Sequence, residues 1–277
     1  MPLKLMYITN NPTIAEIAEG NTVDRIWVDL ETMGKEQRQG HVNSVKSRHT
    51  MEDVSRIRGA IAMAQLLVRV NPLYEGSRRE VDEVIARGAE IVMLPMFNAL
   101  EDAKRFIDLV GGRAKTLLLA ETVYAEEHIA EIASLPGVDE IHIGLNDLHL
   151  EHGMSFMFEL LADGTVERMA GEIIRRGVPF GFGGIARLDE GLLPARHVIA
   201  EHYRLGSSMA ILSRSFYDSW VEAEPDEIRS IFHYGMLEIR AFEARLAEKP
   251  ETYFQENRER VIREVQAVAD KLKSRRG

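Results

Sequence analysis

The sequence contains no cysteine, and nowhere do its apolar residues form a long run. Without cysteine the chain forms neither disulfides nor thiolate metal sites, and the redox compartment stays open on this count. No stretch approaches the ~18 apolar residues of a membrane span, and the apolar stretch at residues 1–8 is too short for a signal peptide. We therefore expect a cytoplasmic protein with no membrane partner.

Positive charge is also in short supply. The chain carries 34 lysines and arginines against 44 aspartates and glutamates, which gives a formal net charge of −10, and its basic residues are dispersed. Such a balance argues against a groove for nucleic acid. It leaves open a local basic pocket for an anionic substrate, and the expected partner is therefore a small molecule.

Strand-like and helix-like segments alternate along the 277 residues, of which 45% are hydrophobic. Apolar runs typical of buried parallel strands lie at residues 3–8, 26–31, 65–70, 90–96, 116–121, 140–145, 179–183 and 203–212. Helical patterns separate them at residues 13–19, 51–63, 78–87, 100–110, 125–134, 156–175 and 194–201. Eight such units predict an α/β fold, the (β/α)8 TIM barrel. An open doubly wound sheet would normally carry a glycine-rich phosphate loop after its first strand, and residues 7–11 contain no glycine.

Two further amphipathic segments follow the alternating part of the chain. Apolar residues recur with helical spacing over residues 225–248 and again over residues 255–273. One of these helices is needed to complete the barrel, so residues 1–248 form the predicted barrel domain. Residues 249–277 form a predicted C-terminal helical extension, whose apolar stripe packs either on its own barrel or on a neighbouring subunit.

Two acidic residues, Glu121 and Asp147, each end an apolar run. A barrel of this kind collects its chemistry at the carboxyl ends of its strands, and two carboxylates there suit a hard divalent cation. The alternative is that either acid merely caps the helix that follows. Gly144 and the glycines of residues 181–184 leave room for the backbone to approach a ligand, or for tight packing of strand on loop.

Charged residues also occur within two neighbouring strands. The two-residue period of a strand places Trp27, Asp29 and Glu31 on one face, directed to the mouth of the barrel. Burying such acids unpaired is costly, so they either pair with a barrel arginine or face the active site. Arg69 closes the next apolar strand, and its planar fork matches the carboxylate of Glu31 or of a substrate.

Five short motifs follow one another at successive strand ends. They are Asp29-Leu30-Glu31, Val68-Arg69-Val70-Asn71-Pro72, Met93-Leu94-Pro95-Met96, Leu119-Ala120-Glu121-Thr122 and Ile143-Gly144-Leu145-Asn146-Asp147-Leu148. In this order they resemble the HpcH/HpaI aldolase and citrate lyase β-subunit family, part of the phosphoenolpyruvate/pyruvate barrel superfamily. The resemblance covers residues 24–215 and implies a metal-dependent carbon–carbon lyase built on a (β/α)8 barrel.

The resemblance also implies roles for single residues. Glu121 and Asp147 would bind Mg²⁺ or Mn²⁺, and Arg69 would contact the keto or enolate oxygen of a pyruvate-like ligand. The carboxylate of that ligand would be held by the backbone amides of Gly144, Leu145, Asn146 and Asp147. In this family the last barrel helix commonly swaps between subunits, which favours a homo-oligomer, a dimer building to a trimer or hexamer.

The implied reaction is a class II type aldol cleavage or condensation on a 2-keto acid. A divalent cation stabilises the pyruvate enolate as a Lewis acid, and Arg69 adds fixed positive charge at the same oxygen. The base is open, because aldolases of this family often carry a histidine directly after the second-strand glutamate and this chain has Thr32. The candidate bases are Glu31, His49 and His149.

Two other functions stay open at this stage. Residues 34–40 resemble the basic loop of the citrate lyase branch, which allows a citrate- or malate-type lyase or a thioesterase acting on a coenzyme A or carrier-protein thioester. The alternative of another class is a family member without turnover that binds an oxyanion, which the loss of the histidine motivates. Retention of Glu121, Asp147 and Arg69 argues against it.

Overall fold

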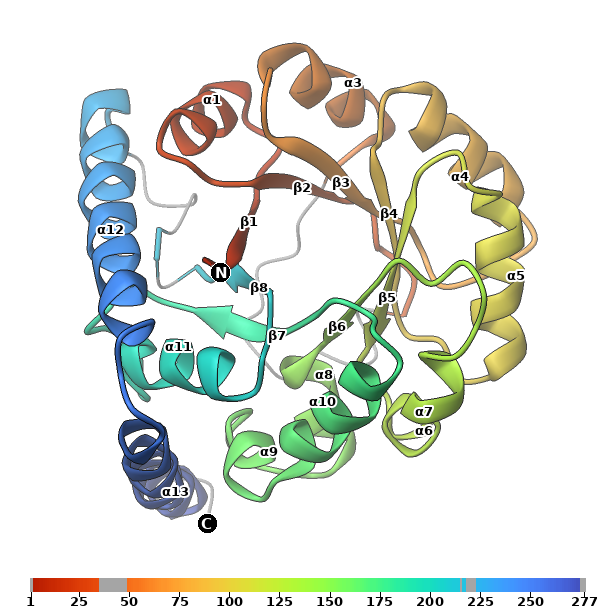
Figure 1. Cartoon of the computed structure of the whole chain (residues 1–277). Helices are drawn as coiled ribbons and strands as arrows, with labels where there is room; N and C mark the ends of the chain where they lie inside the picture. The colour runs from red at the N-terminus through yellow and green to blue at the C-terminus, as the bar shows by residue number, and fades with distance from the viewer. Residues whose placement is uncertain (1, 35–48, 215, 218–222, 275–277) are drawn as a thin grey trace.

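Eight parallel strands close into a barrel in the computed structural model, which describes residues 2–34, 49–214, 216–217 and 223–274. Each strand pairs with the next one along the chain, and β8 pairs with β1 to close the sheet. The strands are β1 (Lys4–Ile8), β2 (Arg25–Asp29), β3 (Gln65–Arg69), β4 (Ile91–Leu94), β5 (Lys115–Ala120), β6 (Glu140–Ile143), β7 (Phe180–Ile185) and β8 (Met209–Leu212). Figure 1 shows the helices as an outer ring around them. The predicted (β/α)8 barrel is confirmed.

The helices fall into a long and a short set. The longer ones are α1 (Pro12–Gly20), α3 (Met51–Ala60), α4 (Ser77–Ala86), α5 (Leu100–Val110), α10 (Thr165–Arg175), α11 (Ala195–Arg204), α12 (Pro225–Leu246) and α13 (Glu251–Lys273). The shorter ones are α6 (Val123–Glu127), α7 (Ile129–Ile132), α8 (Leu145–Glu151) and α9 (Glu159–Ala162). The helix α8, directly after β6, has no counterpart among the expected helices.

Three other segments differ from the expected boundaries. The predicted helix over residues 156–175 is broken because Gly164 has a φ of 89°, in the left-handed region, between α9 and α10. The predicted helix over residues 125–134 is divided at His128, whose ring stacks on Tyr124 with the centroids 4.1 Å apart. The predicted strand over residues 203–212 starts too early, since α11 runs to Arg204 and β8 begins only at Met209.

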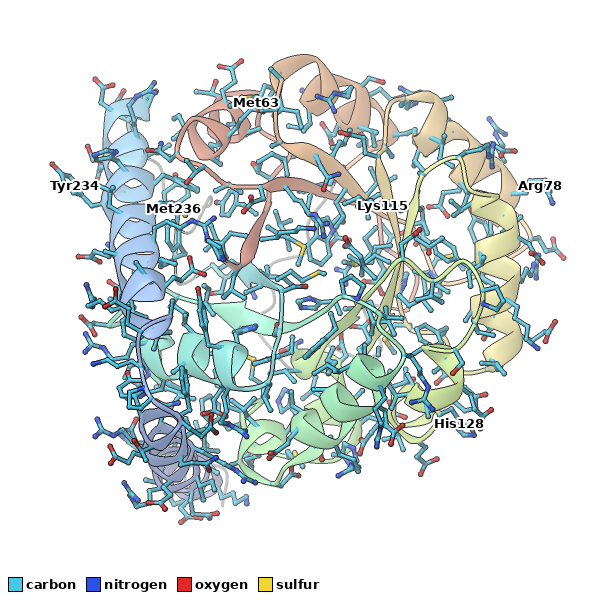
Figure 2. All side chains as sticks on the ribbon, viewed as in Figure 1. Met63, Arg78, Lys115, His128, Tyr234 and Met236 are labelled. Carbon is cyan, nitrogen blue, oxygen red and sulfur yellow. The ribbon has the colours of Figure 1, made fainter. Side chains whose placement is uncertain are left out.

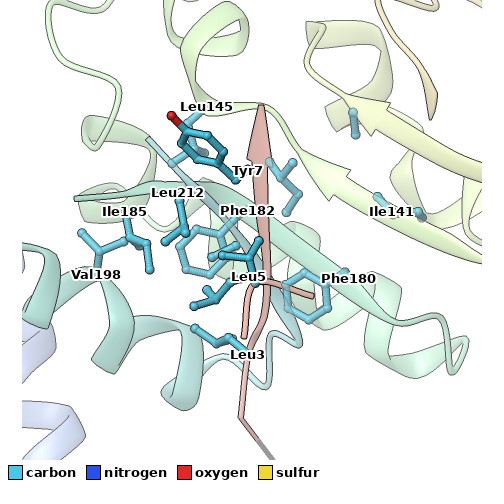
Figure 3. Close-up of a cluster of buried hydrophobic side chains, with 14 of the residues drawn as sticks. Leu3, Leu5, Tyr7, Ile141, Leu145, Phe180, Phe182, Ile185, Val198 and Leu212 are labelled. Atoms are coloured by element: carbon cyan, nitrogen blue, oxygen red, sulfur yellow. The ribbon is translucent and has the colours of Figure 1, made fainter. Parts of the chain in front are cut away.

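Side chains fill the barrel in two concentric layers. Successive residues of a strand point to opposite sides of the sheet, so each strand contributes to both layers. The outer layer lies between the sheet and the helices, and Figure 3 shows part of it, with Phe180, Phe182 and Val198 among its members. The inner layer fills the barrel with Met6, Trp27, Leu67, Ile91, Met93, Leu117, Leu119 and Met209. The barrel interior is therefore a packed core and not a channel.

Gly181 of β7 belongs to this packed interior. A Cβ atom at this position would lie 2.3 Å from Cγ of Met209 and 2.8 Å from Nδ1 of His142. Both separations are far below van der Waals contact, so a larger residue would displace these neighbours. Of the two explanations for the glycines of residues 181–184, tight packing accounts for Gly181.

A buried ion pair closes the amino end of the barrel. Arg25 donates to both carboxylate oxygens of Glu140, at 2.6 and 2.7 Å, and both residues are buried. Lys4 and Lys115 bring further positive charge to 4.0 and 3.8 Å from the same carboxylate. Removing one partner of such a pair leaves an uncompensated buried charge, so this end of the barrel is firmly closed.

The two C-terminal helices pack on the barrel of their own chain. The buried face of α12 includes Ile228, Phe232, Ile239, Phe242 and Leu246. Val261 and Val265 of α13 are buried where that helix lies beside α11 and α9 (Figure 1). Contacts within the chain bury these two residues of the last apolar stripe, and packing of the stripe on a neighbouring subunit stays a prediction, as does the homo-oligomer. Within the described ranges, no helix has both the length and the apolar content needed to cross a membrane.

A buried asparagine fixes the position of α13. The side-chain amide of Asn257 donates to the carbonyl oxygen of His197, at 3.1 Å, and to Oε1 of Glu201, at 2.8 Å. Its own Oδ1 lies 2.8 Å from Nδ1 of His197, which must carry the proton because the amide oxygen only accepts. All three residues are buried, so each polar group depends on the others.

We predict that Asn257→Ala lowers the free energy of unfolding by about 1–3 kcal/mol, because it leaves buried partners on α11 without their hydrogen bonds. Urea unfolding measures the change. Gln255→Ala on the same helix is the matched control, since Gln255 makes only an exposed bond to Glu251 and should stay within about 0.5 kcal/mol of the parent. Equal effects of the two substitutions would contradict the anchoring role of Asn257.

Candidate active site

Three acids and one arginine meet at the carboxyl end of the barrel. Asp29 ends β2, Glu31 follows it, Arg69 ends β3 and Glu121 follows β5. Asp29, Glu31 and Glu121 are only 2%, 1% and 3% exposed. Of these residues, Asp29, Glu31 and Arg69 contact one another. Carboxylates so deeply buried need compensating charge or hydrogen bonds.

Arg69 supplies that charge to Asp29 and Glu31. The register of β2 and β3 places Asp29 opposite Arg69, and the guanidinium donates to both oxygens of Asp29, each at 2.8 Å. The same Nη2 lies 3.2 Å from Oε2 of Glu31, while Nη1 takes no part in these contacts. The guanidinium carbon also lies 5.1 Å from the ring centroid of Trp27, in the geometry of a cation–π contact.

The electrostatic balance favours a permanently charged arginine. Burial alone lowers the pKa of Arg69, but the carboxylates of Asp29, Glu31 and Glu121 outweigh it and raise that pKa above its usual value. Glu121, which follows β5, contributes to this rise least of the three acids. Pairing with a barrel arginine, one of the two alternatives for the strand acids, is therefore what the structure shows, and the pair lies at the mouth itself.

Glu121 is held in place by the backbone of two neighbouring strand ends. The N–H of Met96 donates to Oε1 of Glu121 at 3.2 Å. A Cβ atom at Gly144 would lie 2.6 Å from Cβ and 2.8 Å from Oε2 of Glu121, so only glycine leaves room for this side chain. The N–H of Gly144 already donates to the carbonyl of Ala120 at 2.9 Å, so the role of Gly144 here is to provide space.

Met96 is a site residue that sequence reasoning did not identify. Its φ of 50° puts a residue with a side chain in the left-handed region, where such residues are strained. This conformation accompanies the bond from its N–H to Glu121. The motif Met93-Leu94-Pro95-Met96 marked the segment, but nothing in it indicates a positive φ.

Asp147 lies in the first turn of α8, together with two other predicted substrate-binding residues. Leu145 is buried, Asn146 is exposed and Asp147 is partly buried. The first backbone N–H groups of a helix have no acceptor within that helix. The unexpected helix α8 thus gives the predicted binding segment its conformation.

The two candidate histidines make different contacts. The backbone N–H of Asp29 donates a hydrogen bond to Nδ1 of His49, with the two nitrogens 2.9 Å apart. Because Nδ1 is the acceptor, the neutral ring carries its hydrogen on Nε2. His149 is buried in α8, where Nδ1 lies 3.1 Å from the carbonyl oxygen of Leu145 and donates to it. Burial lowers the pKa of His149, with opposing contributions from the carbonyl bonds and nearby acids. Of the basic loop at residues 34–40, residues 35–40 lie outside the described residues.

Thr32, in the loop after β2, is held by the side chain of Asn71. Its N–H and its hydroxyl donate to Oδ1 of Asn71, at 2.9 and 3.3 Å. The residue at the position of the expected histidine is exposed, and its hydrogen bonds go to Asn71, two residues after β3, and not to the cluster around Arg69.

Comparison with known proteins now identifies the fold and the family together. A family model described as HpcH/HpaI aldolase/citrate lyase matches residues 4–157. The chain belongs to this family. The matched range runs from β1 to beyond α8 and contains Arg69, Glu121 and Asp147. A family of aldolases and lyases supports an enzyme of the lyase kind. No curated protein sequence matches the chain.

Several solved structures share the barrel. An HpcH/HpaI aldolase/citrate lyase family protein from Burkholderia cenocepacia J2315 is 16% identical, with a TM-score of 0.59, over 76% of this chain and 88% of that one. An HpcH/HpaI aldolase from Desulfitobacterium hafniense DCB-2 is 18% identical, with a TM-score of 0.59, over 76% and 86%. The citrate synthase SbnG is 15% identical, with a TM-score of 0.58, over 90% and 96%. At such identities the likeness establishes the fold alone.

The carboxylates at the mouth fit a hard divalent cation by their chemistry. Among the described residues, no group of three or more histidines, aspartates or glutamates is placed to hold a metal ion. Two carboxylates, with water and substrate oxygens in the other positions, are nevertheless a usual set for Mg²⁺. The hydrogen bond from the N–H of Met96 to Oε1 of Glu121 also restricts rotation of that carboxylate.

We predict that Arg69→Met lowers the free energy of unfolding by about 3–5 kcal/mol, because it removes the guanidinium that pairs with the buried carboxylates of Asp29 and Glu31. Adding Asp29→Asn should recover part of this loss, since one of the two remaining partners is then neutral. Chemical denaturation measures both. Arg175→Met, which removes a mostly exposed partner of Glu172, is the control and should change stability by about 0.5 kcal/mol or less. A similar effect at both arginines would contradict the role given to Arg69.

Proposed function

We propose that the protein is a metal-dependent carbon–carbon lyase of the class II aldolase type. It would cleave or form the bond next to a pyruvate-derived enolate in a 2-keto acid substrate. The observation that carries this proposal is the pairing of Arg69 with the buried carboxylates of Asp29 and Glu31, with Glu121 close enough to raise the pKa of Arg69, at the mouth of a barrel of this family. The fixed guanidinium of Arg69 beside these carboxylates suits a reaction in which a bound metal ion contacts an anionic substrate.

Glu121 and Asp147 are the proposed holders of Mg²⁺ or Mn²⁺. When bound, such a cation supplies Lewis-acid stabilisation of the developing enolate. Arg69 places its charge beside the same oxygen, and because Asp29 orients the guanidinium, little rearrangement is needed during the reaction. Gly144 keeps the space that the Glu121 side chain fills, and Leu145, Asn146 and Asp147 present backbone N–H groups to the substrate carboxylate.

Glu31 is the proposed base. It would take the proton from the substrate hydroxyl that becomes the carbonyl of the departing aldehyde. It contacts Arg69, so it lies within the cluster that meets the substrate. His49 accepts a bond from Asp29 through Nδ1, which makes Nε2–H a donor suited to orienting an oxygen atom rather than to removing a proton. His149 is buried and bonded within its own helix, which leaves Glu31 as the stronger candidate.

We predict that the purified protein with Mg²⁺ condenses pyruvate with at least one member of a panel of aldehydes. Glu121→Gln and Asp147→Asn should each weaken Mn²⁺ binding in calorimetry and lower turnover about 100-fold or more, on the scale of other groups that stabilise transition-state charge. Glu127→Gln, an exposed acid on α6, is the matched control and should change neither quantity.

Three outcomes would redirect the proposal. Unchanged Mn²⁺ affinity in both site variants removes the metal and with it the enolate mechanism. Turnover of a coenzyme A or carrier-protein thioester instead of aldehydes favours the citrate- or malate-type lyase or thioesterase. Binding of pyruvate without any turnover favours the oxyanion-binding alternative.

We also propose that the protein is a homo-oligomer, a dimer building to a trimer or hexamer. The stripes expected to hold it together are buried within the chain, but α12 presents another apolar pair to solvent. Tyr234 and Leu237 are 65% and 53% exposed, and Figure 2 shows Tyr234 on the outer side of α12 and Met236 on the side towards the barrel. Apolar side chains grouped on an outer helix face are typical of an interface.

We predict that light scattering finds an oligomer at micromolar concentration, and that the double substitution Tyr234→Glu with Leu237→Glu shifts it to smaller species. Buried charges without partners oppose association at an interface. Met63→Glu is the control, because Met63 is also exposed but lies elsewhere on the surface. A monomeric parent protein contradicts the oligomer, and an unchanged assembly in the double variant moves the interface away from this face of α12.

A further inference from the structure

The loop after Glu31 is held by one asparagine side chain. Oδ1 of Asn71 accepts three hydrogen bonds, from the N–H of Thr32 at 2.9 Å, the hydroxyl of Thr32 at 3.3 Å and the N–H of Met33 at 3.0 Å. Thr32 and Met33 are exposed, so no burial in the core fixes them. The backbone directly after Glu31 therefore depends on the orientation of the Asn71 amide.

Glu80 of α4 fixes that orientation. Its Oε1 accepts the Nδ2–H of Asn71 at 2.7 Å and the backbone N–H of Asn71 at 3.3 Å. Because the NH2 end of the amide is bound to Glu80, its oxygen must face Thr32 and Met33. A 180° flip of the amide would bring its oxygen against the carboxylate of Glu80 and would lose the bonds of the side chain to Glu80, Thr32 and Met33.

Burial makes this contact directional. Glu80 is 7% exposed, and its second oxygen, Oε2, is buried and has no hydrogen-bond partner within the described part of the chain. Both hydrogen bonds described above for the Glu80 carboxylate are thus accepted from one residue, Asn71. Burial raises the pKa of Glu80, against the lowering effect of its two bonds to Asn71.

The sheet register connects this contact to the proposed active site. Asp29 lies opposite Arg69 in the pairing of β2 with β3. Two residues farther along each of these segments come Glu31 and Asn71. Leu30 donates to the carbonyl of Arg69 at 2.9 Å, so the chains still run side by side at this point. The side chain of Glu31 in turn contacts Arg69.

We propose that Glu80 is a positioning residue for the lyase reaction, acting through Asn71 on the loop that carries Glu31. This inference rests on the proposed function only for its effect on turnover. Displacement of a reacting group by a fraction of an ångström lowers rate far more than affinity, so the effect should fall on kcat. Glu121, on the opposite strand ends, should be untouched.

Two substitutions at one position separate positioning from charge. Glu80→Gln keeps an oxygen to accept from Asn71 and replaces only the unpartnered Oε2, whereas Glu80→Ala removes the acceptor. Glu80 already borders a pocket of about 340 Å³ that Tyr74 and Glu83 also line, so shortening it enlarges an existing space. Glu83→Ala, one turn along α4, is the matched control, since Glu83 pairs with Arg87 instead.

We predict that Glu80→Ala lowers kcat about tenfold, with KM for pyruvate and Mn²⁺ affinity within about twofold of the parent. Amide hydrogen exchange at Thr32 and Met33 should become about tenfold faster, because their acceptor is no longer held. Glu80→Gln and Glu83→Ala should retain parental values of all four quantities. If Glu80→Ala fails to fold, Asn71→Ala replaces it, with the same expected losses.

Each other result counts against the inference. Parental kcat and exchange in Glu80→Ala show that Asn71 is held without Glu80. Equal losses in Glu80→Gln show that the charge of Glu80 matters and not its geometry. If the parent protein has no lyase turnover, the proposed function fails on its own, and exchange at Thr32 and Met33 alone decides whether Glu80 holds the loop.

Discussion

The ion pair between Arg69 and Asp29 is the interaction on which the carboxyl end of the barrel depends. Asp29, Glu31 and Glu121 are buried there, and Arg69 pairs with the first two. Unpaired, each acid would favour either unfolding or protonation, because a charge away from water needs a partner. The bidentate bond to Asp29 orients the guanidinium, and the face of Trp27 supports it from the interior. The mouth can therefore remain acidic and still belong to a stable barrel.

Much of this arrangement follows from the sequence. The two-residue period of β2 predicts that Trp27, Asp29 and Glu31 share a face, and closed parallel topology brings the ends of separate strands together. Those two rules are local and geometric, so a single sequence is enough to apply them. They correctly predict the barrel and the neighbourhood of Arg69.

Other features depend on contacts between residues far apart in the chain, and the sequence does not reveal them. The left-handed backbone of Met96 is stabilised by a carboxylate 25 residues away. His49 looks like a base in the sequence, but the amide it binds assigns the proton to Nε2. Each of these depends on a partner that only the folded chain supplies.

The closed amino end of the barrel affects how ligands enter and leave the site. Arg25 and Glu140 fill that end with a buried ion pair, and the inner apolar layer above it leaves no passage through the middle. Anything that reaches Arg69 must therefore arrive and depart through the same opening. Two reactants that share one entrance obstruct each other unless they come in sequence, with the more deeply seated one first. The ion pair at the amino end of the barrel thus favours ordered binding and release.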